Sequence, residues 1–337
     1  MFEHIYNFPE QCESAVLIAR DCIRGLRFHN ILNVVIVGMG GSAIGGELVC
    51  MLTYDRSMIP ITVCRDYRLP GFVDEKTLVI TSSYSGNTQE ALSAYEHAKR
   101  KKARLLAIST GGELIKLAVA DEVPSIIIPA GLQPRAALGY SLMAIAVALE
   151  EQGIVPKSFF NPEAAVALLK KIRDSFSNDS PDDQNLPKIT AQRLFGKIPI
   201  IYGISGITDA IALRWKSQIN ENAKHPAFCN SFPELTHNEI MGFDGDERLL
   251  KKMEIVILRD PRENEDVSKQ ISIMTDLIKD KVAGISNIYP EGESPMERAL
   301  FHIMYGDYVS AYLALLNDKD PFEINLITSL KKRIKSP

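Results

Sequence analysis

Residues 83–88, with the sequence SYSGNT, have the composition of a phosphate-binding loop. They follow an apolar run that is typical of a buried strand and precede a stretch with helical periodicity. Hydroxyl groups and the N–H groups at a helix start give a phosphate dianion many short-range donors. Simple capping of the helix is the alternative, but capping needs only one hydroxyl. The predicted donors are Ser83, Ser85 and Thr88, and Gly86 frees the backbone for the turn.

A second loop, residues 37–46 with the sequence VGMGGSAIGG, lies between another predicted strand and helix. Its backbone N–H groups also suit an anion, and we assign Ser42 to the phosphate-binding residues and Gly40 and Gly41 to the substrate loop. The same loop fits the dinucleotide fingerprint G-x-G-x-x-A, and Asp66 follows the next strand at about the expected distance. A nicotinamide- or flavin-dependent oxidoreductase is therefore a second hypothesis. A dinucleotide-binding domain, however, has no need of another phosphate cradle.

Three further residues could move or stabilise charge. Glu221 lies at the end of a predicted helix, in the sequence NENAK. His237 lies in the polar sequence ELTHNE, and a histidine side chain can transfer a proton. Arg135 follows a proline that fixes its approach. Each has a structural alternative, namely a solvated carboxylate, a surface histidine or a surface ion pair, and the residues alone do not choose between these alternatives.

Alternating strand and helix patterns must position these side chains. Continuous apolar runs joined by amphipathic stretches are typical of parallel strands that are buried on both faces. In the first half, strands are predicted at 33–37, 61–63, 78–82, 104–108 and 125–128, and helices at 43–52, 88–101 and 136–150. In the second half, strands are predicted at 199–203, 254–258 and 282–288, and helices at 208–222, 268–279, 296–316 and 322–334. The recurring pattern suggests an internal duplication.

The polar, proline-containing stretch 175–188 separates the two patterns and is the clearest linker in the chain. A helix start with a proline at its first position precedes it at 161–163. We therefore expect an α/β protein with two αβα sandwich domains and parallel sheets. The expected domains are 1–155 and 191–337, joined by a connecting helix and linker at 156–190.

The composition argues against several classes of protein. A formal net charge of −4 and a pI near 5.9 offer no basic field, so no nucleic-acid partner is expected. Five cysteines without a C-x-x-C pair indicate reduced thiols. The N-terminus has no apolar signal region, and no apolar run reaches the roughly 18 residues of a membrane span. We expect a cytoplasmic protein with no membrane partner, and neither a metal nor a cofactor, because no His, Asp and Glu cluster has ligand spacing.

Three segments join the two loops in one pattern: QPRA at 133–136, NENAK at 220–224 and ELTHNE at 234–239. With the S-x-S-G-x-T loop between a strand and a helix, they resemble the sugar isomerase (SIS) fold. More specifically, they resemble the bifunctional phosphoglucose/phosphomannose isomerases, which carry two SIS domains in one chain. The resemblance covers nearly the whole length, and the NENAK and ELTHNE segments are more specific than the glycine loop.

The resemblance implies an aldose–ketose isomerase that interconverts glucose 6-phosphate, and mannose 6-phosphate, with fructose 6-phosphate through a cis-enediol. It implies that Glu221 is the base and that Arg135 faces the enediolate oxygens. In the family, the histidine at the place of His237 reaches the active site of the neighbouring subunit. A homodimer with shared active sites is therefore expected. A C-terminal lysine near the site is also implied, and Lys331 is the candidate.

The C-terminal tail departs from the family pattern. Small hydroxyl residues there are associated with acceptance of both C2 epimers. Thr328 lies nearby, but Phe322 and Ile324 occupy the expected stretch, so the sequence supports glucose phosphate activity more than mannose phosphate activity. A non-catalytic sugar-phosphate sensor on the same fold is a third hypothesis, disfavoured because no helix-turn-helix domain is attached.

Overall fold

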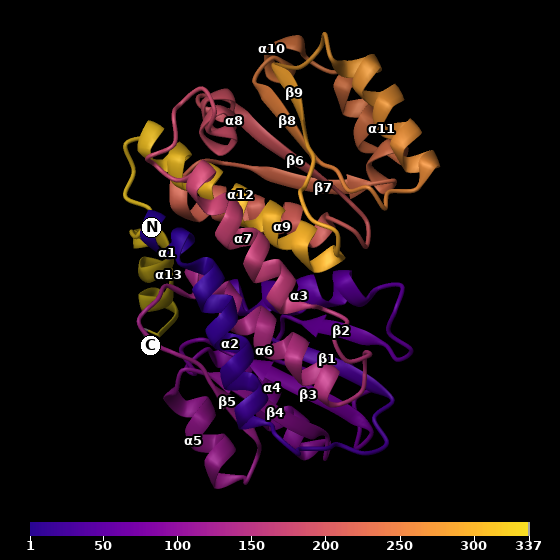
Figure 1. The fold of residues 1–337 in the computed structure, drawn as a ribbon, viewed down its shortest axis with the longest axis vertical. Helices are drawn as coiled ribbons and strands as arrows, with labels where there is room; N and C mark the ends of the chain where they lie inside the picture. The colour runs from indigo at the N-terminus through magenta and orange to yellow at the C-terminus, as the bar shows by residue number, and fades with distance from the viewer. Residues whose placement is uncertain (336–337) are drawn as a thin grey trace.

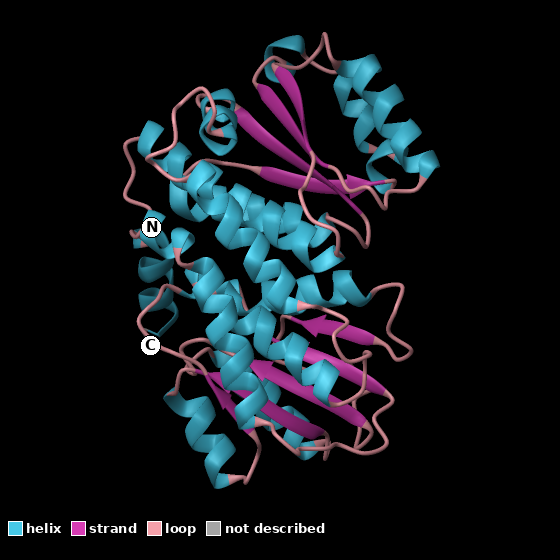
Figure 2. Cartoon of the chain, in the orientation of Figure 1, coloured by secondary structure: helices cyan, strands magenta, loops and turns pink. Residues whose placement is uncertain are grey.

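The computed structural model describes residues 1–335. Two parallel β-sheets lie at opposite ends of the molecule, and a thick layer of helices lies between them (Figures 1 and 2). The strand order is β2-β1-β3-β4-β5 in the first sheet and β7-β6-β8-β9 in the second. The predicted α/β class with parallel sheets is therefore confirmed.

The first sheet opens a crevice between two of its strands. α3 (Gly41–Thr53) and α6 (Leu138–Glu151) cover one face, and α4 (Gln89–Arg100) and α5 (Gly112–Ala120) cover the other. The chain leaves β1 toward α3 and leaves β3 toward α4, so the carboxyl ends of β1 and β3 flank a topological switch point. The strands are β1 (Asn33–Val37), β2 (Ile61–Cys64), β3 (Thr77–Ser82), β4 (Arg104–Ser109) and β5 (Ser125–Ile127).

The second sheet contains a strand that the sequence analysis missed. β7 is an edge strand with the sequence FCNSF and is only partly buried, so it lacks the continuous apolar run of a central strand. α11 (Glu265–Ile278) covers the outer face of this sheet, and α9 (Asp209–Ala223) and α12 (Pro295–Leu316) cover the inner face. The strands are β6 (Ile198–Ile204), β7 (Phe228–Phe232), β8 (Met253–Leu258) and β9 (Gly284–Ile288).

The helices between the sheets share one apolar core. α12 packs against α9, α8 (Leu186–Leu194) and α7 (Pro162–Phe176), and α7 also packs against α2 (Phe8–Cys22). The predicted connecting helix therefore belongs to the core of both halves. The other helices are α1 (Phe2–Tyr6), α10 (Glu247–Leu250) and α13 (Asn325–Lys335), with 3₁₀ turns η1 (Pro134–Ala136), η2 (Glu234–His237) and η3 (Glu239–Asp244).

α12 is almost entirely buried. Within the described residues it is the one helix long and apolar enough to cross a membrane, yet 89% of its most apolar 18-residue window lies inside the protein. Its first turn is closed by a reciprocal capping box between Ser294 and Glu297. The five cysteines, all within the described chain, are unpaired. α1, α2, α5 and α8 were not predicted, because they are short or lie outside the repeating strand–helix pattern.

His302, on α12, links the stability of this layer to pH. Its ring is fully buried, Nε2 lies 2.9 Å from the carbonyl oxygen of Arg259, and Nδ1 has no partner among the described residues. Burial lowers the pKa of His302 to about 4, so the folded state favours the neutral imidazole. The free energy of unfolding is then highest above the ordinary pKa of about 6.5 and falls by up to about 3 kcal/mol as the pH drops toward 4.

We expect His302→Gln to flatten the pH dependence of the free energy of unfolding between about pH 4 and pH 7, since the glutamine does not titrate. Urea denaturation at a series of pH values measures this dependence. His29→Gln is the matched control, because His29 is exposed. A wild-type pH dependence in His302→Gln would show that this histidine does not cause the loss of stability.

Candidate active site

Two loops meet in the crevice between β1 and β3. The backbone N–H of Tyr84 donates to Ser42 Oγ at 3.1 Å, which joins the 83–88 loop to the glycine loop. The Tyr84 hydroxyl in turn donates to the carbonyl oxygen of Pro129 and accepts from the N–H of Leu132, each at 3.0 Å. The structure thus brings the two predicted substrate loops together.

The 83–88 loop presents hydroxyl groups beside an uncapped helix start. Thr88 is the N-cap residue of α4, but its side chain makes no capping hydrogen bond. Instead, Ser83 Oγ donates to Thr88 Oγ1 at 3.1 Å, and the exposed Ser85 Oγ accepts from the N–H of Asn87 at 3.3 Å. The capping explanation is therefore wrong for Thr88. N–H groups at such a helix start stabilise a bound anion.

Glycine is required at two positions of these loops. Gly86 has φ of +66°, and a Cβ there would lie 1.9 Å from the carbonyl oxygen of Gly111. A Cβ on Gly41 would lie 2.6 Å from the carbonyl oxygen of Pro134, the residue before Arg135. Because Gly41 has no side chain, η1 can lie against the glycine loop and bring Arg135 to the crevice.

Glu221 and Arg135 meet at the junction of the two halves. Glu221 lies in the last turn of α9, and its Oε2 is 3.5 Å from Nη1 of Arg135. The Glu221 side chain is 32% exposed, whereas the Arg135 side chain is 5% exposed. The carboxylate is thus accessible while the guanidinium is buried behind it. A surface ion pair does not describe this arrangement, because Arg135 is buried.

Arg135 is held by several partners besides Glu221. Its Nε donates to Asn222 Oδ1 at 2.8 Å, and its Nη1 donates to Gln133 Oε1 at 2.7 Å. Nη2 donates to the carbonyl oxygen of Pro321. Burial lowers the pKa of Arg135, and Glu221 raises it. The ordinary pKa of arginine is so high that the guanidinium stays charged at neutral pH.

The segment before α13 is attached to the same site. Three successive carbonyl oxygens, at residues 320–322, accept hydrogen bonds from the side chains of Lys224, Arg135 and Gln133 respectively. Lys331 lies on α13, which follows this segment, but its side chain is exposed and does not line the pocket that contains Glu221. The role of Lys331 stays a prediction.

His237 lies in the second half, at the end of η2, and is exposed. Other residues of the ELTHNE segment hold the loop in place. The Tyr202 hydroxyl donates to Glu239 at 2.5 Å, and Asn238 donates to Glu234 at 2.8 Å. Within one chain, His237 is not among the described residues that line the Glu221 pocket. Its expected contribution to the site of a second subunit stays a prediction.

Glu221 and Arg135 line a pocket of about 90 Å³ between the glycine loop and α9. This volume is well below the roughly 300–1,000 Å³ of typical ligand pockets, so the pocket can enclose only part of a sugar phosphate. The sequence analysis missed four polar lining residues: Arg65, Arg214, Ser217 and Gln218. The last three lie seven, four and three residues before Glu221, on the same face of α9, so the helical period could have identified them.

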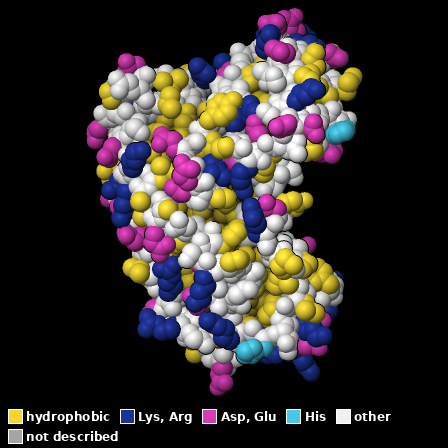
Figure 3. Space-filling model, turned by 45° about the vertical axis from the view of Figure 1, so that its right-hand side comes forward, with side chains coloured by type: hydrophobic (Ala, Val, Ile, Leu, Met, Phe, Trp, Pro, Cys, Tyr) yellow, Lys and Arg dark blue, Asp and Glu magenta, His cyan; other side chains and the backbone are white. Residues whose placement is uncertain are grey.

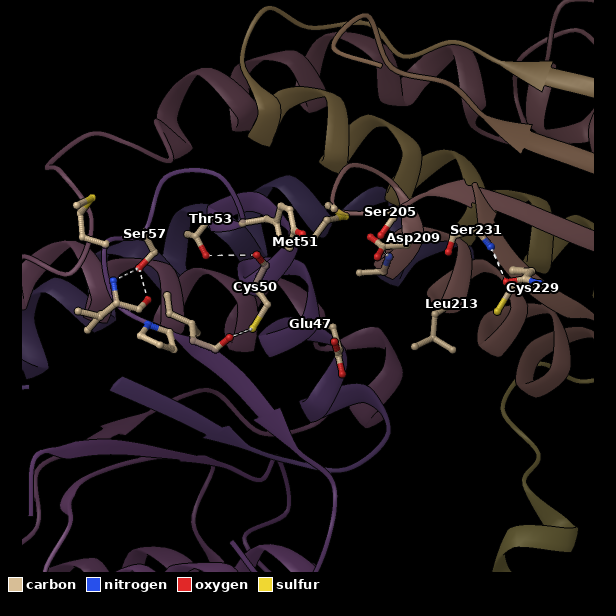
Figure 4. Close-up of a pocket in the computed structure, with 18 residues that line it drawn as sticks. Glu47, Cys50, Met51, Thr53, Ser57, Ser205, Asp209, Leu213, Cys229 and Ser231 are labelled. Atoms are coloured by element: carbon tan, nitrogen blue, oxygen red, sulfur yellow. Dashed lines mark hydrogen bonds between the residues drawn. The ribbon is translucent and has the colours of Figure 1, made fainter. Parts of the chain in front are cut away.

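A larger cleft of about 730 Å³ opens beside this pocket, between α3 and the carboxyl ends of β6 and β7. The surface is hollowed between the two halves in Figure 3. Figure 4 shows Glu47 and Thr53 on one side of the cleft and Ser205, Asp209 and Ser231 on the other. None of the described residues that line it is basic, and two are carboxylates, so the cleft does not suit a phosphate dianion.

The crevice of the second sheet, between β6 and β8, is closed by the protein itself. The Thr208 hydroxyl donates to the carbonyl oxygen of Leu258 at 2.9 Å and accepts from the N–H of Ile204 at 2.9 Å. After β8, Arg259 pairs with Glu263. In the second half, the residues that follow β6 and β8 therefore bond to each other within the chain.

Comparisons with known proteins agree with this geometry. Residues 183–334 match a family model described as bacterial phospho-glucose isomerase C-terminal SIS domain. The chain is 45% identical over 334 residues to a bifunctional phosphoglucose/phosphomannose isomerase of Caldicellulosiruptor bescii, across 99% of this chain and 98% of that one. A relative with the same description from Thermoplasma acidophilum is 37% identical over 336 residues, across 98% of each chain. This chain belongs to the bifunctional phosphoglucose/phosphomannose isomerase family.

Membership of this isomerase family confirms the predicted class of enzyme, an isomerase of sugar phosphates, and supports neither the oxidoreductase nor the sensor hypothesis. The SIS fold is confirmed as well. The structure is similar to the C-terminal domain of glucosamine-fructose-6-phosphate aminotransferase from Francisella tularensis, with a TM-score of 0.72, 16% identity and coverage of 95% of this chain and 97% of that one.

The NENAK segment of this isomerase, at the end of α9, contains residues that fix the backbone and residues that line or orient the pocket. Asn220 Oδ1 accepts from the N–H of Ala227 at 2.9 Å and so fixes the following turn. Glu221 enters the pocket, and Asn222 orients Arg135. Lys224 adopts a left-handed conformation with φ of +50° and ends the helix. The positions of these residues in the segment therefore follow from the end of α9 at Ala223.

We expect Ser85→Ala combined with Thr88→Ala to raise the KM for a hexose phosphate by about 100-fold, because two hydrogen bonds to a charged phosphate are lost. Steady-state kinetics measures the change. Ser205→Ala combined with Ser231→Ala is the matched control, since these hydroxyls line the neighbouring cleft. An unchanged KM in the first variant, or an equal rise in the control, would place the phosphate outside residues 83–88.

Proposed function

We propose that this isomerase interconverts glucose 6-phosphate, and also mannose 6-phosphate, with fructose 6-phosphate in the cytoplasm. The observation that carries the proposal is the pairing of Glu221 with Arg135 at 3.5 Å, next to the glycine loop that Ser42 joins to the 83–88 loop. The two relatives are described as acting on both phosphoglucose and phosphomannose, which supports the choice of substrates. In this proposal the 83–88 loop holds the phosphate, and the small pocket receives C1 and C2.

Proton transfer follows from this placement. Glu221 removes the proton from C2 of the open-chain aldose, and the C1 carbonyl oxygen takes the negative charge of a cis-enediolate. The proton of the C2 hydroxyl then passes to the oxygen on C1, the carboxyl group returns its proton to carbon C1, and C2 becomes the carbonyl carbon. Arg135 stabilises the oxyanion throughout. One carboxylate serves both carbons because they are adjacent, and the step requires neither a metal nor a cofactor.

A homodimer completes the proposed site. His237 from a second subunit transfers the proton to the ring oxygen when the sugar ring opens. Two features of the surface support a subunit contact. His237 is exposed, and α13 carries exposed apolar side chains at Leu326, Leu330 and Ile334, spaced four residues apart along one face. In the same proposal Lys331, also on α13, assists at the site.

Acceptance of mannose phosphate depends on the tail. The C2 epimers give the same enediol, so discrimination between them requires contacts around C2 and its hydroxyl. The backbone of Phe322 is fixed by Gln133, next to Arg135, which places the tail at the edge of the site. The Phe322 and Thr328 side chains are exposed, and in this proposal the tail admits both epimers.

We expect Glu221→Gln to lower kcat for the interconversion of fructose and glucose 6-phosphates by at least about 100-fold, because glutamine cannot accept the proton. Substrate binding should persist, since the phosphate loop is intact. Coupled assays with EDTA present, and calorimetric titration with fructose 6-phosphate, measure the two properties. Asp209→Asn, at the other end of α9, is the matched control and should keep wild-type turnover. Full turnover of Glu221→Gln would remove Glu221 as the base.

Subunit complementation tests the shared site. Glu221→Gln and His237→Asn are each expected to be nearly inactive, because each removes one proton-transfer group from every site. In a mixed dimer, one site has both substitutions and the other has neither. Co-refolding equal amounts should therefore restore about a quarter of wild-type activity. If the mixture stays as inactive as its components while mixed dimers are detected by native mass spectrometry, His237 does not act across the subunit interface.

A further inference from the structure

A buried polar network that the proposed mechanism does not use begins at Arg214 and Gln218, which line the small pocket beside Arg135, and extends from there to α12. Asp307, on α12, accepts hydrogen bonds from Arg214 Nη2 at 2.6 Å and from Gln218 Nε2 at 3.0 Å. Ser310, one turn further along α12, donates to the carbonyl oxygen of Asp307 at 2.7 Å and accepts from Asn222 Nδ2 at 2.9 Å. All five side chains are buried. The network therefore joins the polar face of α9 to α12.

The network reaches Arg135 by two routes. Arg214 Nη2 donates to the carbonyl oxygen of Arg135 at 3.2 Å, which fixes the backbone of η1. Asn222 Oδ1 accepts from Arg135 Nε at 2.8 Å, which fixes the direction of the guanidinium. Both routes lead back to α12 in the second half, whereas Arg135 belongs to the first half. The distance between Arg135 and Glu221 is thus determined across the junction.

Stability alone does not explain an ion pair at this depth. Arg214 and Asp307 are 3% and 8% exposed in their side chains, and desolvation offsets most of what such a pair contributes to folding. Arg214 Nε even lacks a hydrogen-bond partner among the described residues. Apolar residues of the same volume could fill the space at no loss of stability. The polar groups are better explained by the position that they impose on Arg135.

We propose that Asp307, Arg214 and Ser310 are positioning residues, which hold Arg135 at the distance from Glu221 that proton transfer requires. This inference rests on the proposed roles of Glu221 and Arg135. Since the phosphate is held separately by the 83–88 loop, the network acts on turnover more than on substrate binding.

The matched control is a second buried ion pair, of which one residue lies on α12. Arg298, also on α12, donates from Nε to Asp260 Oδ2 at 2.9 Å, and the two side chains are 7% and 3% exposed. This pair does not line the Glu221 pocket. Its loss has a comparable effect on folding and provides a reference for a purely structural role.

We expect Asp307→Asn, which keeps the shape of the side chain and removes its charge, to lower kcat for fructose 6-phosphate roughly 10- to 100-fold while KM changes less than about 3-fold. Asp260→Asn should lower the midpoint of thermal unfolding but keep kcat within about 3-fold of wild type. Arg214→Lys, which keeps a charge opposite Asp307, should retain more turnover than Arg214→Gln. Ser310→Ala removes a single hydroxyl and provides the same kcat test if Asp307→Asn does not fold.

Glu221→Gln, measured in the same assay, distinguishes a failure of the positioning role from a failure of the proposed function. If Glu221→Gln is inactive and Asp307→Asn or Ser310→Ala keeps wild-type kcat, the positioning role is wrong and the proposed function stands. Equal losses of kcat in Asp307→Asn and Asp260→Asn would also overturn the positioning role. An active Glu221→Gln variant would overturn the proposed function, and the inference with it.

Discussion

The geometry of the site depends on the buried charge of Arg135. A guanidinium that is removed from water is tolerated only where its donors find acceptors, and these acceptors come from both halves of the chain. Gln133 belongs to the same segment as Arg135, whereas Asn222, Glu221 and the carbonyl oxygen of Pro321 belong to the second half and the tail. Separating the halves would leave Arg135 with Gln133 as the one remaining acceptor of those named here. The Arg135 charge, which is proposed to stabilise the enediolate, therefore also fixes the position of the two halves relative to each other.

The two halves have similar folds but contribute different parts of the candidate site. In the first half, the switch point between β1 and β3 stays open, and a loop without a capping side chain leads into α4. In the second half, Thr208 closes the corresponding crevice and Glu263 pairs with Arg259 next to it. The second half instead supplies Glu221 from the end of α9. One pocket with Glu221 and Arg135 results from two similar folds, because the sheets contribute different parts of the same site.

Much of the site was predictable from local sequence. The 83–88 loop was identified because three hydroxyls and a glycine lie between an apolar strand and a helix, and every one of these features is local. Glu221 and Arg135 were assigned through their motifs, and the structure supplies the physical reason, since the NENAK segment ends α9 at the pocket. The central strands were predictable for the same reason, because burial on both faces requires continuous apolar runs.

Other parts depend on long-range contacts that local patterns do not contain. β7 is half exposed and polar, so it has no strand signature until it pairs with β6. Arg214 and Asp307 are 93 positions apart in the sequence. Each is a charged residue of a kind that is common on exposed helix surfaces, so neither indicates a buried pair by itself. Gly41 lines the small pocket and also makes room for Pro134, and only the second of these contacts was absent from the sequence prediction. The roles proposed for His237 and Lys331 involve a second subunit and the tail, which local sequence patterns do not describe.

The most direct test of this account is a crystal structure with a five-carbon aldonic acid phosphate, whose carboxylate has the charge and shape of the enediolate. The account predicts that the phosphate lies against Ser83, Ser85 and Thr88 at the start of α4, with the carboxylate against Arg135 and facing Glu221. A phosphate in the neighbouring cleft, or a ligand carboxylate that does not contact Arg135, would contradict it.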